Sequence, residues 1–343
     1  KMFNDLKKLS DPTNYKDLIN LNKLNKSQLA SFLKKMLLIR NVEYKVANLV
    51  KNEIIKCPCH LCVGQEAISV GVLSHCIKGD MVYGNHRSHG HYLALGGDLK
   101  KFFLELEGKP GGSSKGMGGS MHLVDRKVGF EGSVPIVAGT IPIAVGAALK
   151  SKIKNDNSIA IAFFGDGACE EGVFHESLNF ASLHSLPIIF VAENNLFSSH
   201  LDIHLRQPSN KLSRFADANK IKNYTIDGND VVKVFETIKK EIQNLRKGSG
   251  PIFLECVTFR HFGHVGHEEN IDVGVKRTQK DVVNWKRVDP ILRLSKSLIK
   301  KNFFSSKEIQ DMSANIINDI DKIYKSSKRN IITKQKKIKQ FSC

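Results

Sequence analysis

Two short apolar segments, each followed by compact polar residues, constrain the fold of this chain more than any other feature. The run at 158–164 precedes Gly165-Asp166-Gly167, and the run at 188–192 precedes Glu193-Asn194-Asn195. Such runs are typical of buried strands. Because parallel strands end at the same edge of a sheet, we expect Asp166 and Asn195 to meet there, where open α/β sheets bind ligands. Their oxygen atoms suit Mg²⁺ or Ca²⁺ holding a phosphate group, and Gly165 and Gly167 let the backbone approach that phosphate.

The order of predicted elements indicates an α/β fold. Strands alternate with crossover helices from residue 158 onward, which predicts a parallel sheet. The expected strands are 158–164, 188–192, 224–227 and 252–259, and the expected crossover helices are 170–184 and 231–246. Other helices are predicted at 28–51 with Ser27 as its cap, 66–76, 141–149, 280–300 and 307–324. The glycine-rich stretch 79–139 is predicted to form binding loops.

This pattern divides the chain into three parts. Residues 1–26 are interpreted as a polar leader, 27–275 as the α/β binding domain, and 276–343 as a helical C-terminal extension that ends in a basic tail. With 343 residues, the chain is long enough for a large core.

The formal net charge of +18 raises the question of an acidic partner. A nucleic acid or an acidic membrane is one explanation. However, the lysines are spread along the chain without interleaved aromatic residues, which favours solvated lysines over a binding surface. We therefore expect neither a nucleic-acid nor a membrane partner. No apolar run is long enough to cross a bilayer, and the N-terminus lacks a hydrophobic signal core, so a cytoplasmic location is the default expectation.

A cluster of cysteines and one histidine invites a zinc hypothesis. Cys57, Cys59, His60 and Cys62 lie within six residues, but a second spaced pair of ligands is missing from the sequence. Structural zinc sites usually combine two such halves. Reduced thiols are therefore the favoured interpretation.

The spacing of the two polar segments resembles a known cofactor motif. GDG at 165–167, followed about thirty residues later by NN at 194–195, is similar to the thiamine-diphosphate motif. The longer string from 165 to 176, with 193–195, resembles the α subunits of 2-oxo-acid dehydrogenase E1 components, of the pyruvate and acetoin dehydrogenase type. The resemblance extends from about residue 60 to 289. It implies a three-layer, doubly wound parallel sheet of the thiamine-diphosphate-binding fold with helical extensions at both ends.

The resemblance also implies a cofactor site. Asp166, Asn195 and the carbonyl of Phe197 would bind Mg²⁺, and diphosphate oxygens and water would complete the octahedron. Gly165, Gly167 and Ala168 would bring the backbone and its N–H groups to the diphosphate.

Further segments match the same family. The segment 86–90 places Arg87 on the diphosphate, although His86 stands where tyrosine is usual. The segment 60–67 makes His60 an active-site histidine, and 116–123 resembles a family loop. Ile136 and Val137 align with the backbone that meets the aminopyrimidine ring.

A loop at 259–265 resembles the one that closes over the active site in this family. The match places Arg260 on the diphosphate and His264 at the reaction centre. Val265 replaces a serine that is phosphorylated in some relatives, so phosphorylation at this position is excluded.

The expected function follows from these matches. The chain would be the α subunit of an α₂β₂ E1 enzyme acting on a small 2-oxo acid, pyruvate-like, or on acetoin or another α-hydroxyketone. The acyl group would pass to a lipoyl-bearing E2 partner, with His60 and His264 handling protons. The glutamate that activates the cofactor would come from the β subunit, so the chain alone would be inactive. Three alternatives remain: an E1 α-like enzyme without a lipoyl partner, the cofactor half of a split transketolase, and a scaffolding or nucleic-acid-binding protein whose site has decayed.

Overall fold

The strands form a parallel sheet whose order places the two polar segments side by side. In the computed structural model, which describes residues 3–269 and 277–339, six parallel strands run in the order β2-β1-β3-β4-β8-β7. These are β1 (Met81–Gly84), β2 (Phe130–Ser133), β3 (Ala160–Gly165), β4 (Ile188–Asn194), β7 (Lys222–Asp227) and β8 (Ile252–Val257). The central pair β3 and β4 is in register, with Gly165 opposite Glu193. The predicted parallel α/β sheet is confirmed.

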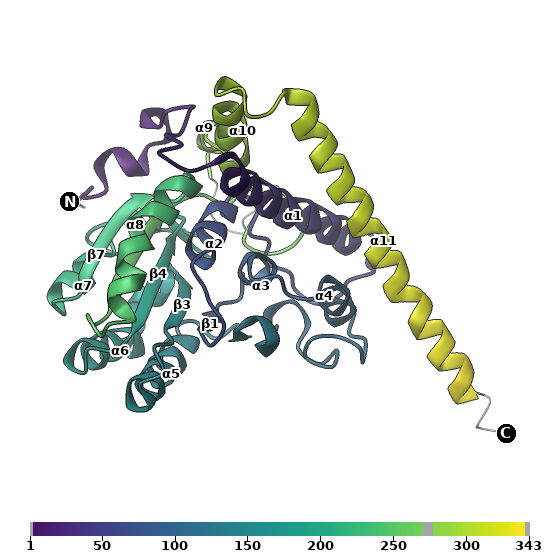
Figure 1. The fold of residues 1–343 in the computed structure, drawn as a ribbon, viewed down its shortest axis with the longest axis horizontal. Coiled ribbons are helices and arrows are strands. Elements are labelled where there is room, and N and C mark those ends of the chain that lie inside the picture. Colours follow the sequence, from purple (N-terminus) through teal and green to yellow (C-terminus); the bar gives the residue numbers. More distant parts are fainter. Residues whose placement is uncertain (1–2, 270–276, 340–343) are drawn as a thin grey trace.

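Helices cover both faces of the sheet, which gives three layers (Figure 1). One face packs against α1 (Lys26–Lys51), α2 (Glu66–Leu73), α3 (His89–Ala94) and α8 (Val231–Leu245). The other face packs against α5 (Thr140–Lys154), α6 (Gly172–Leu183) and α7 (Arg214–Ala218).

Side chains alternate along the central strands, as the pleat of a strand requires. On β3, Ile161 and Phe163 lie in the core beneath α1 and α2, while Ala160, Ala162 and Phe164 lie in the core beneath α5 and α6. Because both faces are buried, these strands are apolar throughout, as parallel strands between two helical layers generally are.

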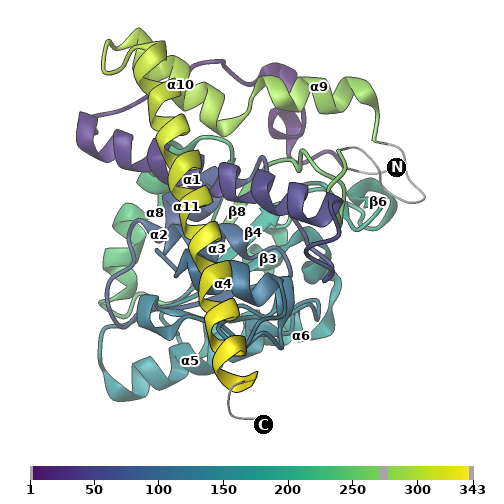
Figure 2. The same ribbon diagram turned by 90° about the vertical axis from the view of Figure 1, so that its right-hand side faces the viewer.

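The C-terminal helices pack along one side of the molecule. They are α9 (Gln279–Arg287), α10 (Pro290–Lys300) and α11 (Ser306–Lys339). In Figure 2, α11 crosses in front of α1 and α4 (Leu99–Leu106). Arg40 on α1 also reaches Asp289 at the start of α10, with 2.7 Å between Nη2 and Oδ2. The C-terminal helices are thereby attached to the binding domain.

Several predicted boundaries are wrong, for local reasons. The cap of α1 is Asn25, whose side chain accepts the N–H of Gln28, so the helix begins before Ser27. The segment predicted as one helix from 170 is a 3-10 helix at Asp166–Glu170 followed by α6 from Gly172. The segment 280–300 is divided between α9 and α10, because Asp289 caps α10 and Pro290 lies in its first turn.

The stretch 79–139 is more ordered than predicted. It contains β1, α3, α4 and β2 between its glycine-rich loops. Residues 3–25 include two short 3-10 helices, and Leu6 and Tyr15 are buried in a small core that also contains Trp285. The predicted boundary between 275 and 276 lies outside the described residues, so the division into three parts stays a prediction.

Candidate active site

A cavity of about 230 Å³ lies at the carboxyl edge of the central strands. It is bordered by the ends of β3 and β4, by the loops after β1 and β8, and by the segment before α2. Of the residues predicted to form a site, the cavity is lined by His60, Arg87, Ile136, Val137, Gly165, Asp166, Gly167, Ala168, Asn195, Phe197 and His264. Eleven of the twelve predicted residues therefore surround one space.

Asp166 and Asn195 lie next to each other because their strands are paired. Asp166 follows the last residue of β3, and Asn195 follows the last residue of β4. Both side chains are buried. Asn195 is oriented by two hydrogen bonds: its Nδ2 donates to Gln65 Oε1 at 3.2 Å, and its Oδ1 accepts the N–H of Phe197 at 3.2 Å. The amide oxygen and the carboxylate thus lie where hard oxygen ligands are expected.

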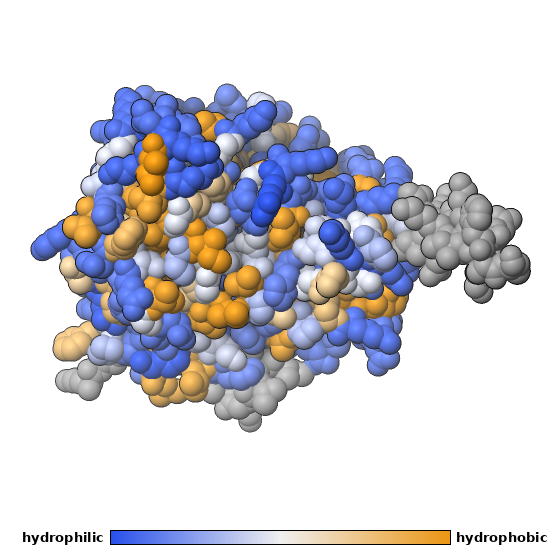
Figure 3. All heavy atoms as spheres, turned by 90° about the horizontal axis from the view of Figure 1, so that it is seen from below, coloured by the Kyte–Doolittle hydropathy of each residue, from blue (hydrophilic) through white to orange (hydrophobic). Residues whose placement is uncertain are grey.

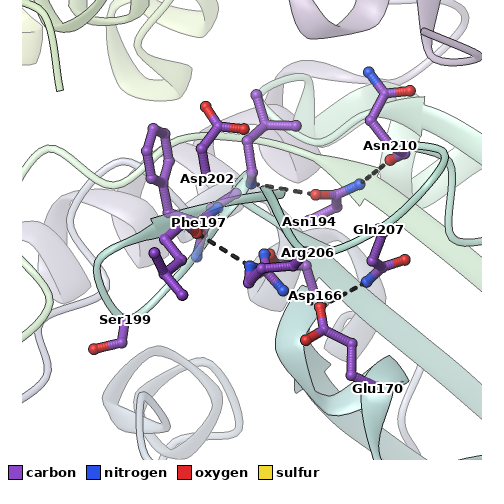
Figure 4. A network of polar contacts seen from close by, with 12 residues as sticks. Asp166, Glu170, Asn194, Phe197, Ser199, Asp202, Arg206, Gln207 and Asn210 are labelled. Carbon is purple, nitrogen blue, oxygen red and sulfur yellow. Dashed lines mark hydrogen bonds and ion pairs between the residues drawn. The ribbon is translucent and has the colours of Figure 1, made fainter. Parts of the chain in front are cut away.

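Arg206 forms an ion pair with Asp166 that the sequence analysis did not anticipate (Figure 4). Its guanidinium contacts the carboxylates of both Asp166 and Glu170. Gln207 adds a hydrogen bond to Glu170 at 2.9 Å. Burial raises the pKa of Asp166, and Arg206 opposes that rise. A cation bound by Asp166 would therefore share its carboxylate with this arginine.

Ser198 and Gly167 meet at a tight contact beside Asp166. Phe197 begins a two-stranded antiparallel hairpin of β5 (Phe197–Ser198) and β6 (Leu201–Asp202). A Cβ atom on Gly167 would lie 2.2 Å from Ser198 Oγ, which is far too close. Glycine at 167 is thus required for the hairpin to pack against the 3-10 helix that contains Gly167 and Ala168.

Arg87 holds two cavity loops together. Its Nη1 donates to the carbonyl of Leu61 at 2.7 Å, and its Nη2 donates to the carbonyl of His264 at 3.1 Å. The side chain is buried, and burial lowers its pKa to about 10. Arg87 therefore positions the segments that carry His60 and His264, in addition to lining the cavity.

Three histidines gather at the other end of the cavity. The ring centroids of His60 and His86 are 4.7 Å apart, those of His60 and His264 are 4.9 Å apart, and those of His86 and His264 are 5.4 Å apart. Burial, followed by the positive charge of Arg87, lowers the pKa of each imidazole to about 2. All three rings are therefore neutral at physiological pH. Within the described residues, Nδ1 of His60 is buried and has no hydrogen-bond partner.

Arg260 is the one predicted residue that is not among those lining the cavity. It is almost fully buried, and its Nη2 donates to the carbonyl of Ser199 at 3.0 Å. It therefore lies behind the 199–200 turn, where its charge acts on the histidines from a distance.

Ile136 and Val137 form an apolar edge at the mouth of the cavity. They are 72% and 48% exposed, and exposed apolar surface of this kind often marks an interaction site. Additional apolar side chains are exposed on the nearby helices α5 and α6. They are Ile143, Ile153, Phe180 and Leu183. Figure 3 shows this side of the molecule, with apolar patches between charged ones.

Two buried glutamates organise the loops around the cavity, and sequence reasoning missed both. Glu43 on α1 accepts the N–H of Cys62 at 2.7 Å and lies 2.8 Å from His89 Nδ1, whose other ring nitrogen lies 2.8 Å from Ser120 Oγ. Glu43 lies 46 residues before His89 in the sequence, so no local pattern marks it.

The second glutamate, Glu105 on α4, anchors the glycine-rich loop. Its carboxylate accepts four backbone N–H groups, from Ser114, Gly116, Gly118 and Gly119, at 2.7–3.1 Å. A buried carboxylate with four donors is well satisfied and rigid. Glu105 thus anchors the first part of the loop predicted at 116–123.

Within the described residues, Cys57, Cys59 and Cys62 are not grouped as metal ligands. Within residues 3–269 and 277–339, Cys57, Cys59 and Cys62 are free thiols, and the group of side chains close enough to share a metal ion contains histidines alone. The expectation that they hold no zinc stays a prediction. In the same part of the chain, no helix is both long and apolar enough to cross a membrane.

Comparisons with known proteins agree with this geometry. A family model described as dehydrogenase E1 component matches residues 34–336. The α subunit of acetoin:2,6-dichlorophenolindophenol oxidoreductase from Bacillus subtilis (strain 168) is 35% identical over 288 residues, which cover 84% of this chain and 85% of that protein. The pyruvate dehydrogenase E1 component subunit alpha from Rhizobium meliloti (strain 1021) is 33% identical over 285 residues, 82% of this chain and 80% of that protein. The same subunit from Rickettsia bellii (strain RML369-C) is 31% identical over 291 residues, which cover 85% of this chain and 88% of that protein.

Proposed function

Since this chain belongs to the dehydrogenase E1 component family, we propose that it is the α subunit of a thiamine-diphosphate-dependent E1 enzyme acting on a small 2-oxo acid or on acetoin. One observation carries the proposal: oxygen ligands and neutral histidines line the same cavity at the carboxyl edge of β3 and β4. The relatives named for pyruvate and for acetoin supply the two substrate classes.

The residues present fit a diphosphate held by Mg²⁺. Asp166, Asn195 and the carbonyl of Phe197 would hold the cation, which prefers such oxygen ligands. Arg206 does not oppose this fit, because Asp166 has a second oxygen and the guanidinium already compensates part of its buried charge.

The remaining predicted residues would hold the cofactor. Gly165, Gly167 and Ala168 would face the diphosphate through their backbone, with Arg87 and Arg260 supplying positive charge. Ile136 and Val137 would contact the aminopyrimidine ring. When bound, thiamine diphosphate supplies the nucleophilic carbon and the electron sink of the reaction.

His60 and His264 would move the protons. Each ring is neutral and lines the cavity, so each has a nitrogen that can accept or share a proton. A negatively charged substrate would raise the pKa of both imidazoles toward neutrality, because it offsets the positive charge of Arg87. Their capacity as acid and base would therefore increase when the substrate enters.

A β subunit would cover the open side of the cavity. The exposed apolar edge at Ile136 and Val137 supports this, since such surfaces are buried in stable complexes. Among the residues that line the cavity, the carboxylates are Asp166 and Glu193, and Glu193 is engaged by His91 at 3.1 Å. The activating glutamate would therefore come from the β subunit in an α₂β₂ assembly. A lipoyl-bearing E2 partner would accept the acyl group.

The proposal can be tested on the chain purified with its β subunit. Calorimetric titration with thiamine diphosphate and Mg²⁺ should show one site per α subunit, and reduction of 2,6-dichlorophenolindophenol should follow addition of pyruvate or acetoin. Asp166→Ala should lose both signals, while Asp319→Ala, at an exposed carboxylate, should retain them. Undiminished cofactor binding by Asp166→Ala would refute the assigned site. Dye reduction without acyl transfer to a lipoyl domain would favour the enzyme class that lacks an E2 partner.

A further inference from the structure

The three cavity histidines form a cluster that suits a metal other than Mg²⁺. One ligand nitrogen from each of His60, His86 and His264 lies within 4.8 Å of the others. We propose that these three imidazoles form a binding site for a transition-metal dication such as Zn²⁺ or Co²⁺. The site is separate from the oxygen ligands at Asp166 and Asn195, and the inference does not depend on the proposed function.

The geometry requires only a small closure of the cluster. In a tetrahedral zinc site with Zn–N bonds of about 2.05 Å, ligand nitrogens lie about 3.4 Å apart. His86 belongs to the loop after β1, His264 to the loop after β8, and His60 to the segment before α2. Because all three come from loops, side-chain rotation and small loop shifts can bring the nitrogens from 4.8 Å or less to ligand distance.

A second observation points to a missing partner at the same place. Nδ1 of His60 is buried and has no hydrogen-bond partner among the described residues. Leaving such a group unsatisfied is destabilising, so buried polar atoms in proteins nearly always have a hydrogen-bond partner. A metal ion at the centre of the cluster would offer one to this ring.

The ligand set determines the kind of metal. Imidazole nitrogens favour Zn²⁺, Co²⁺, Ni²⁺ and Cu²⁺, whereas Mg²⁺ prefers oxygen. Because a histidine binds a metal ion in its neutral form, neutral rings release no proton when the metal binds. Arg87 lies nearby and disfavours a dication, so the fourth position should be taken by an anion, such as hydroxide or a small carboxylate, that reduces the net charge.

His86 is the residue that makes the site. It stands at a position where the E1 α pattern usually has tyrosine, and a phenol does not replace a neutral imidazole as a zinc ligand. A chain with tyrosine there would keep two histidines, which is too few for a strong site. A metal bound to the cluster would occupy a ring nitrogen of His60 and of His264, so it should inhibit any reaction that needs these nitrogens for proton transfer.

The test is a Co²⁺ titration of the full-length chain in metal-free buffer, without β subunit or thiamine diphosphate. Four-coordinate Co²⁺ bound by nitrogen ligands gives visible absorption bands, and these should appear with one equivalent and disappear when Zn²⁺ is added. His86→Tyr should weaken Co²⁺ binding by at least about 100-fold, since it removes one of three ligands. His122→Gln, at a histidine outside the cluster, should leave the titration unchanged.

Two further variants keep the outcome decisive. If circular dichroism shows that His86→Tyr does not fold, His264→Asn should give the same loss. Cys57→Ser should have no effect, and a thiolate-to-cobalt band that it abolishes would assign the metal to the cysteines and overturn the proposal. Absence of Co²⁺ binding by the wild-type chain, or equal binding by wild type and both histidine variants, would also overturn it. Cofactor binding is measured separately and does not enter this result.

Discussion

The two ends of the cavity are built by different means. At the oxygen end, Asp166 and Asn195 follow directly from adjacent strands whose register places them side by side. At the histidine end, His60, His86 and His264 come from three separate segments that are held together by Arg87. The first end therefore inherits its geometry from the sheet, whereas the second depends on side chains that join loops. Substitutions should act locally at the first end and through the loops at the second.

The largest expected effect is at the oxygen end. Asp166→Ala should abolish measurable binding of thiamine diphosphate in the presence of Mg²⁺, because a carboxylate ligand is lost. Calorimetry on the complex with the β subunit checks this, with Asp319→Ala as the matched control. Because strand register does not depend on the side chain, circular dichroism should stay unchanged. A collapse of secondary structure would contradict the view that the sheet alone sets this end.

The next effect concerns the ion pair at the same end. Arg206→Met leaves the carboxylate of Asp166 buried without its partner, which should lower the free energy of unfolding by about 3 kcal/mol in metal-free buffer. Mg²⁺ should restore part of this loss, since the cation no longer shares the carboxylate with Arg206. Urea unfolding with and without Mg²⁺ measures both the loss of stability and its partial recovery. Arg126→Met, at an exposed arginine, serves as the control, and an equal Mg²⁺ response in both variants would contradict the coupling.

A smaller effect is expected where the hairpin meets the 3-10 helix. Gly167→Ala should lower the free energy of unfolding by about 2 kcal/mol, because the new methyl group overlaps Ser198. Combining it with Ser198→Gly should recover much of the loss. A double-mutant cycle by urea unfolding gives the coupling between the two positions. Additive losses would mean that the close contact is not the cause.

The response of stability to pH is the effect that best separates the two ends. The pKa of each cavity histidine falls from 6.5 to about 2 on folding, so below pH 6.5 the unfolded chain binds more protons and stability falls as pH falls. For each proton that the unfolded chain binds and the folded chain does not, the free energy of unfolding changes by about 1.4 kcal/mol per pH unit. His86→Gln should reduce this slope by at most one proton, because the rings interact.

Asp166 should respond with the opposite sign. Folding raises the pKa of Asp166, so as pH falls the carboxyl group is protonated in the folded chain before it is protonated in the unfolded chain. The cost of burying the charged carboxylate, which lowers stability at higher pH, is therefore relieved as pH falls through the folded pKa. Asp166→Asn should therefore make the acid side of the stability profile steeper. Urea unfolding between about pH 4 and pH 8 measures how the free energy of unfolding of both variants changes with pH. Slopes that change in the same direction would contradict the contrast between the ends.

The contrast also explains what sequence reasoning could predict. The apolar runs before Asp166 and Asn195 predicted both strands and their meeting point, since buried parallel strands leave a clear pattern. The β1 and β2 strands were missed because each has four residues within a glycine-rich stretch. Assigning roles to His60 and His264 required the family resemblance, because a single histidine carries no periodic signal.

Contacts between residues that are distant in the sequence could not be predicted from it. Arg206 lies 40 residues from Asp166, and Glu43 lies 46 residues from His89. Only the folded chain brings these partners together, and neither has a motif that identifies its role. The predicted helix caps and ends were wrong where one polar side chain, such as Asn25, decided the boundary.

The anchoring of the glycine-rich loop by Glu105 bears on the order in which the chain acquires its structure during synthesis. Glu105 lies on α4, and α4 packs against α11 through Phe103 and Tyr324, whose rings are 5.1 Å apart, while Tyr324 donates to Glu107 at 2.7 Å. Since Tyr324 follows Glu107 by 217 residues, α4 gains this outer support only after α11 has been synthesised. The loop beside the cavity should therefore become rigid late, and a nascent chain stalled before residue 306 would present a formed sheet with its glycine-rich loop still open to proteases.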